Sequence, residues 1–150
     1  AQEDSPSSFN YHGSVGATFD LLETSSGRVI LTFQKEKERK RRLERRKFYK
    51  KFESASKIPT KQLKDIEKKF SNNSMQKINK DGHELVKSLQ IKGVTNISVP
   101  LFDYTGSAIA ALTIPFVDRI ISTGEPKLEE VKNLLKNSGQ RISSDMGYKK

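Results

Sequence analysis

Cysteine is absent from the 150 residues, and no apolar run approaches the length of a membrane span. Without cysteine the chain has no disulfide framework and no thiolate metal site. A membrane-spanning helix needs roughly 18 consecutive apolar residues, and no signal-peptide pattern opens the sequence. We therefore expect a cytoplasmic, soluble protein with no membrane partner.

The sequence motifs typical of enzyme active sites are also absent. There is no nucleophile elbow, no His, Asp and Glu cluster at metal-ligand spacing, and no pair of carboxylates within an apolar run. These are the patterns from which catalytic chemistry is predicted in a sequence. We predict that the chain is not an enzyme, and that it has no catalytic residue, no metal site and no cofactor.

Positive charge is plentiful and unevenly placed. The net charge is +10, and residues 35–51 hold eleven Lys and Arg against three Glu. Such a run can form a surface for nucleic acid or for an acidic partner. It can equally form an exposed, solvated helix that is partly self-paired, for example through Glu38 and Arg42. A nucleic-acid-binding module acting through this helix is therefore our second hypothesis.

The stretch from Gly93 to Phe116 is the most apolar part of this otherwise polar chain. Two runs rich in β-branched residues flank the turn-forming residues Asp103 to Gly106. Asp can bond the backbone ahead of it and Gly can adopt positive φ, so the pattern predicts a β-hairpin. We expect this hairpin to form the centre of the sheet.

The length of the hairpin loop decides which residues face each other. A four-residue loop gives one apolar face and one small, polar face on which Asn96 lies beside Thr113. The apolar face then carries Ile97, Val99 and Leu101 opposite Leu112, Ala110 and Ala108. A three-residue loop would put Ser98 opposite Leu112 and would mix the two kinds of residue. Because burial of one face specifies register, we expect the four-residue loop.

Helices dominate the rest of the chain. We expect a strand over 9–19, helices over 25–33, 35–51 and 59–70, a short helix closing at Asp81-Gly82, a strand over 83–89 and a helix over 127–142. Ser25 is the expected N-cap of the first helix, whose free N–H groups favour an anion; a merely capped helix is the alternative. This order predicts one α+β domain over 1–150, with helices flanking a largely antiparallel sheet.

The order of these features resembles the effector-binding C-terminal domain of IclR-type bacterial transcriptional regulators. The motifs that carry the resemblance are Ser25-Ser26-Gly27-Arg28, Gly82-His83, Gly93-Val94, Phe102-Asp103-Tyr104-Thr105-Gly106 and Ala108 to Leu112. They cover roughly residues 3–145. The resemblance implies a GAF-like fold, a ligand-sensing role in transcription regulation, and a homodimer or homotetramer. It also implies DNA binding through an N-terminal winged helix-turn-helix that this chain lacks, so the chain resembles a fragment of a longer regulator.

The family's effectors are small organic or aromatic acids, bound between the helix start and the two central strands. Carried onto this sequence, the implied effector-binding residues are Phe19, Ser25, Ser26, Gly27, Val86, Val94, Asn96, Ser98 and Thr113. The family's acidic residue near Val86 is replaced here by Leu85-Val86-Lys87. We therefore expect a compact or largely apolar acid rather than a polyhydroxylated ligand.

Overall fold

The computed structural model describes residues 19–50, 70, 72–89, 91–117, 124 and 126–149. In chain order its elements are α1 (Ser25–Thr32), α2 (Glu36–Lys50), α4 (Asn72–Asp81), β1 (Glu84–Lys87), β2 (Val94–Phe102), β3 (Ala108–Val117) and α5 (Leu128–Asp145). This composition confirms the α+β class. The strand expected over 9–19 falls almost wholly outside the described residues, as does nearly all of the helix expected over 59–70.

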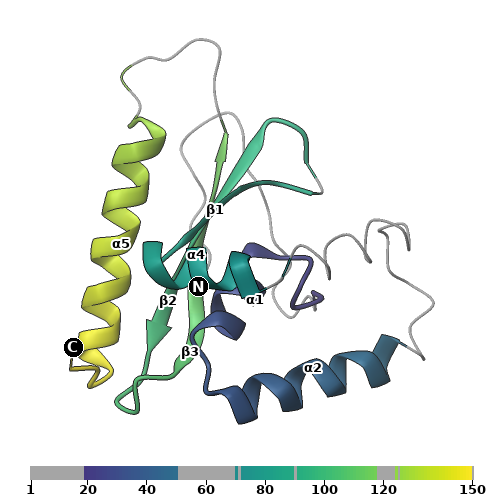
Figure 1. The fold of residues 1–150 in the computed structure, drawn as a ribbon. Helices are drawn as coiled ribbons and strands as arrows, with labels where there is room; N and C mark the ends of the chain where they lie inside the picture. Colours follow the sequence, from purple (N-terminus) through teal and green to yellow (C-terminus); the bar gives the residue numbers. More distant parts are fainter. Residues whose placement is uncertain are drawn as a thin grey trace.

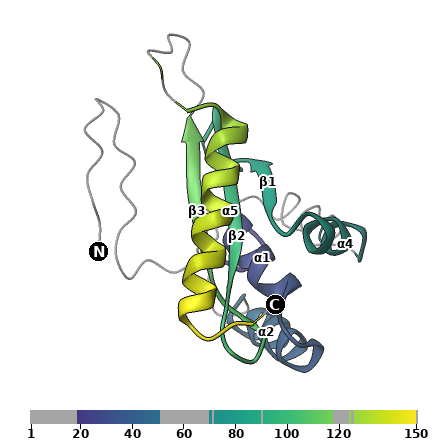
Figure 2. The ribbon, with the colours of Figure 1, turned by 90° about the vertical axis from the view of Figure 1, so that its left-hand side faces the viewer.

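The three strands form an antiparallel sheet in the order β1-β2-β3. Helix α5 runs along one face of this sheet, and α1 packs on the opposite face (Figures 1 and 2). Helix α4 lies next to α1 and leads into β1. The sheet is therefore a middle layer between α5 and α1.

One apolar core cluster fills the space between α5 and the sheet, and further buried apolar residues, among them Val29 and Leu31 of α1, lie outside it. Ile97 and Val99 of β2 and Leu135 of α5 are its fully buried members. Partly buried apolar residues surround them, namely Leu112, Ile114, Phe116, Leu128 and Val131. Alternate residues of a strand share a face, so the apolar face predicted from the sequence is the one that α5 covers. Of the two adjacent leucines of α5, Leu135 is buried and Leu134 is exposed.

The predicted hairpin is present, but its predicted register is wrong by two residues. Asn96 lies opposite Pro115, and Ser98 lies opposite Thr113. A shift of two residues keeps every side chain on its face, which is why the division into an apolar and a polar face is correct. The prediction that Asn96 and Thr113 face each other directly is incorrect.

The turn explains the error. The Asp103 carboxylate accepts hydrogen bonds from the backbone N–H groups of Thr105 (2.9 Å) and Ser107 (3.3 Å) and from the Thr105 hydroxyl (2.6 Å). These bonds hold Ser107 inside the turn, so the first strand pair is Phe102 with Ala108. An irregularity between Leu101 and Phe102 then moves the register by one more residue. Neither effect is encoded in the alternation of apolar residues.

Helix α2 carries the basic run, and the predicted helix is confirmed. Glu38 accepts hydrogen bonds from Arg41 (2.9 Å) and Arg42 (3.1 Å), as expected for a self-paired helix. Arg46 departs from the expected exposure, because its guanidinium is buried and bonds both oxygens of Asp20, at 2.6 and 2.8 Å. Near its C-terminal end, α2 is thus fixed to the segment that precedes α1. The helix as a whole lies away from the sheet (Figure 1).

Candidate functional site

Three hydroxyl groups form a continuous chain on the α1 face of the sheet. The Oγ atoms of Ser25 and Ser98 are 2.7 Å apart, and Ser98 Oγ is 2.8 Å from Thr113 Oγ1. Ser25 and Ser98 are fully buried, whereas Thr113 is exposed. The chain of hydroxyls therefore leads from the first turn of α1, across β2, to the surface at β3.

Helix α1 directs Ser25 toward the sheet because another residue caps it. The N-cap is Thr24, whose hydroxyl accepts the N–H of Gly27 at 3.1 Å. The predicted N-cap, Ser25, is instead the first helical residue, so its hydroxyl is available to Ser98. A Cβ at Gly27 would lie 2.2 Å from the Leu21 carbonyl oxygen, so only glycine permits this close return of the chain.

Val94 and Asn96 lie on the same face of β2 as Ser98, because they alternate with it. Val86 of β1 lies directly opposite Asn96, which places it on that face as well. Val94 is buried, while Asn96 and Val86 are half-buried.

The structure thus brings Ser25, Ser98 and Thr113 into direct contact and places the three other sheet residues beside them. Ser26 follows Ser25 in α1 and is half-buried. Phe19 is 59% exposed, so among the described residues it does not form a buried apolar wall of this site.

Arg28 turns inward, and this arrangement fixes α1 to β1. Its Nε donates to Glu84 at 2.8 and 3.1 Å, and its Nη1 donates to the Leu22 carbonyl oxygen at 2.8 Å. Burial raises the pKa of Glu84 by more than the hydrogen bond and charge of Arg28 lower it. Arg28 thus forms an ion pair with a half-buried carboxylate of its own chain, so its positive charge is balanced within the fold.

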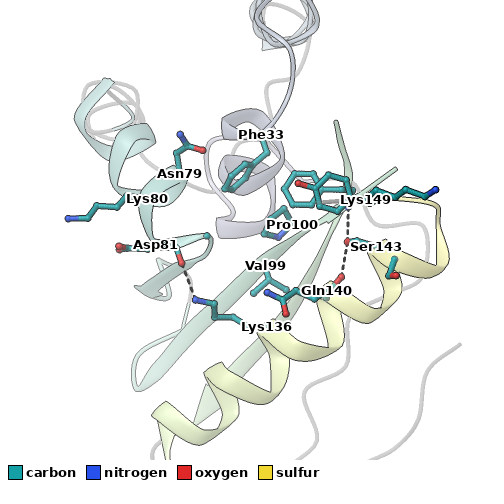
Figure 3. A pocket seen from close by; sticks show the side chains of 15 residues that line it. Phe33, Asn79, Lys80, Asp81, Val99, Pro100, Lys136, Gln140, Ser143 and Lys149 are labelled. Carbon is teal, nitrogen blue, oxygen red and sulfur yellow. Dashed lines mark hydrogen bonds between the residues drawn. The ribbon is translucent and has the colours of Figure 1, made fainter. Parts of the chain in front are cut away.

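A cleft of about 830 Å³ lies elsewhere, at the edge of β2 between α4 and α5 (Figure 3). It does not include any of the nine predicted effector-binding residues. In this structure the hydroxyls of the α1 face touch one another directly, so Thr113 is the end of that chain that a ligand can reach.

Within the described part of the chain, no group of three or more His, Asp and Glu side chains is arranged to hold a metal ion. None of the helices in that part is long and apolar enough to cross a membrane.

Comparison with known proteins gives consistent matches. Residues 2–144 match the family model described as bacterial transcriptional regulator IclR C-terminal. The chain is 28% identical over 145 residues to the HTH-type transcriptional regulator KdgR of Escherichia coli (strain K12), covering 97% of the chain and 51% of KdgR. It therefore spans about half the length of that relative.

Solved structures agree with this match. The crystal structure of the C-terminal domain of E. coli KdgR has a TM-score of 0.58 at 25% identity, covering 85% of this chain and 71% of that one. The Thermotoga maritima IclR structure has a TM-score of 0.65 at 30% identity, covering 96% of this chain and 54% of that one. The resemblance carried by the order of the sequence motifs is confirmed. This chain belongs to the family of C-terminal domains of IclR-type bacterial transcriptional regulators.

Proposed function

We propose that this chain is a single ligand-sensing domain, part of a longer regulator, that binds a small organic or aromatic acid on the α1 face of its sheet. Binding would control DNA recognition by a winged helix-turn-helix outside this chain, in a homodimer or homotetramer, with no chemical step. One structural observation supports the proposal in addition to family membership. A chain of hydroxyls joins the first turn of α1 to the exposed Thr113.

The chemistry of this face suits a carboxylate. The Thr113 hydroxyl and the Asn96 amide both offer hydrogen-bond donors, and both lie on the α1 face. The N-terminus of α1, which begins at Ser25, adds a partial positive charge that favours an anion. The neighbouring Val86 and Val94 are apolar, which favours an acid with a compact or apolar body over a polyhydroxylated one.

The contacts also suggest how occupancy would be transmitted. Thr113 reaches α1 through Ser98 and Ser25, and α1 reaches β1 through Arg28 and Glu84. A ligand shifts an equilibrium only if it binds two states with different affinity. An acid that draws the Thr113 hydroxyl toward itself would alter its bond with Ser98 and thereby favour one position of α1.

The test is a thermal-shift screen with small carboxylic acids on the wild-type chain and on the double variant Asn96→Leu with Thr113→Val. A specific ligand at 100 times its Kd stabilises the folded state by about 2.7 kcal/mol. We expect this stabilisation in the wild type and its loss in the double variant. Thr95→Val is the matched control, because Thr95 lies on β2 but alternates with Asn96 and so faces α5. Equal stabilisation of the wild type and the double variant would place the ligand elsewhere.

A second candidate function is DNA-backbone binding by α2. Its exposed cations are Lys37, Lys40, Arg41 and Arg45, with Lys35 exposed just before it, and the ion pairs of Glu36 and Glu38 offset only part of this charge. Phosphate neutralisation lowers log K by about 0.9 per contact for each tenfold rise in salt. Fluorescence anisotropy with a labelled duplex should therefore show binding that weakens steeply with salt and is lost in Lys37→Glu with Arg41→Glu. An absence of binding at about 0.1 M salt would eliminate this candidate.

A further inference from the structure

The cleft beside β2 exists because β1 is shorter than β2. The last residue of β2 that pairs with β1 is Ser98, opposite Glu84 at the start of β1. Strand β2 continues to Phe102, and among the residues that the structure describes its final residues have no strand neighbour on that side. Helix α4 and the second half of α5 line the space that is left, which has a volume of about 830 Å³ (Figure 3). This is within the range of small-molecule sites in proteins.

This open edge is unsuited to the addition of a peptide strand. The hydrogen bond from Ser88 N to Val94 O, at 2.8 Å, shows that even-numbered residues of β2 direct their backbone groups toward β1. Pro100 is the next even-numbered residue of β2 beyond its pairing with β1, and it has no backbone N–H to donate. At Phe102 the N–H donates to the Ser143 hydroxyl of α5, at 3.0 Å. Because the chain itself removes both donors of the edge, the cleft suits a small molecule rather than a strand.

Aromatic rings form one wall of the cleft. Phe33, after α1, meets Phe102 edge-on with a centroid distance of 5.4 Å. Tyr148, after α5, stacks on Phe102 at 4.7 Å. All three residues line the cleft. A ligand with a flat ring could extend this cluster, in which both edge-to-face and stacked contacts already occur.

The charge of the cleft is positive. Lys80, Lys136 and Lys149 line it, against the single carboxylate of Asp81. Lys80 and Lys149 extend away from the centre, whereas Lys136 points across the cleft (Figure 3). The Lys136 ammonium donates to the Asp81 carbonyl oxygen at the end of α4, at 3.2 Å. An ammonium has three donors, so this bond positions the charge and leaves donors for a ligand.

We propose that this cleft is a second ligand site, separate from the α1 face, and that it takes a ring-bearing anion such as an aromatic carboxylate. The ring stacks along Phe33, Phe102 and Tyr148, and the carboxylate accepts from Lys136. The bound molecule then bridges α4 and α5, which the Lys136–Asp81 hydrogen bond already joins. Occupancy thereby links the C-terminal helix to the segment that leads into β1.

The experiment is a titration of the ¹⁵N-labelled chain with benzoate, followed by the amide shifts of Gly82, Phe102 and Gly139 around the cleft. We expect these amides to move together with one Kd between about 0.1 and 10 mM, the affinity range of a small ligand that makes a few contacts. Benzylammonium, which has the same ring and the opposite charge, and acetate, which has no ring, should both bind at least about tenfold more weakly.

Two variants test the position of the ligand. Gln140→Trp places a large ring in the cleft from an exposed position of α5 and should abolish the shifts. Lys136→Met keeps the length of the side chain, removes its charge and should weaken benzoate about tenfold. Lys132→Met, one turn earlier in the same helix, is the matched control and should leave the Kd unchanged. If Gln140→Trp does not fold, Lys136→Met still decides the matter.

The outcomes also separate this proposal from the proposed function. Shifts confined to the cleft amides, and retained in Asn96→Leu with Thr113→Val, support a second site. Shifts confined to Ser98 and Thr113 support the acid site on the α1 face and overturn the second site. No shift at the cleft amides by about 20 mM benzoate, or the same Kd in Lys136→Met, also overturns it.

Discussion

Gly139→Ala tests the close approach between α5 and β2, at the point where the helix crosses the strand. A Cβ at residue 139 would lie 2.8 Å from Val99 Cγ2 and 3.6 Å from the Pro100 carbonyl oxygen. Alanine in a helix interior is favoured over glycine by about 1 kcal/mol. The Val99 methyl would have to retreat by roughly half an ångström, but Val99 is buried and stiff at χ1. Overpacking of this kind costs about 1–3 kcal/mol, so after the gain in helix propensity we expect a net loss of up to about 2 kcal/mol.

Urea denaturation of a double-mutant cycle measures this clash directly. Val99→Ala alone should cost about 2 kcal/mol, because it removes buried methyl groups and leaves a cavity. Combined with Gly139→Ala it should cost less than the sum, because the new methyl group enters the vacated space, with a coupling of about 1 kcal/mol or more. Ser138→Ala, at an exposed position one residue earlier, is the control and should be neutral or slightly stabilising. A Gly139→Ala variant at least as stable as the wild type, or strictly additive free energies, would refute the packing described for α5.

Three further predictions concern buried polar groups. Ser98→Ala should cost about 1–3 kcal/mol by urea denaturation, because it leaves a buried hydroxyl without its partner; a cost near zero would show that the hydroxyl chain is unimportant for stability. Burial raises the pKa of Glu84, so relative to Glu84→Gln the wild type should be most stable below the ordinary pKa of 4.5 and should lose that advantage as the pH rises; a relative stability that increases with pH would show that Arg28 outweighs burial. Arg46→Ala should cost about 3–5 kcal/mol in thermal or urea unfolding because it removes a buried guanidinium that bonds both carboxylate oxygens of the half-buried Asp20, whereas Arg41→Ala, at an exposed pair, should cost less than about 1 kcal/mol. Equal effects of the two arginine variants would contradict the burial of Arg46.

Local sequence patterns predicted the elements of the described region and the division of the sheet into two faces. Alternation of apolar residues assigned Ile97 and Val99 to the core face, and both are buried there. The same alternation could not set the register, because register depends on how many residues the turn holds. Three hydrogen bonds to the Asp103 carboxylate lengthened that turn by one residue, and the irregularity between Leu101 and Phe102 added another, so that Thr113 lies opposite Ser98 and not Asn96.

Buried ion pairs were beyond the reach of local patterns. Arg28 and Glu84 are 56 residues apart, and Arg46 and Asp20 are 26 apart, so nothing near either arginine in the sequence marks its partner. Arg46 also sits within a run of similar charges, which favoured an exposed helix throughout. The cleft depends on β1 ending before β2, a difference in strand length that hydrophobic patterns do not fix.

The central claim is that a small acid binds beside Thr113 and Asn96, and amide chemical-shift mapping tests it most directly. The ¹⁵N-labelled chain would be titrated with the acid that stabilises it most in the thermal screen. The account predicts that the side-chain amide of Asn96 and the backbone amides of Ser98 and Thr113 shift together with a single Kd. It also predicts that the shifts disappear in Asn96→Leu with Thr113→Val. If an acid stabilised the chain but left the chemical shifts of these three residues unchanged, that result would contradict the account.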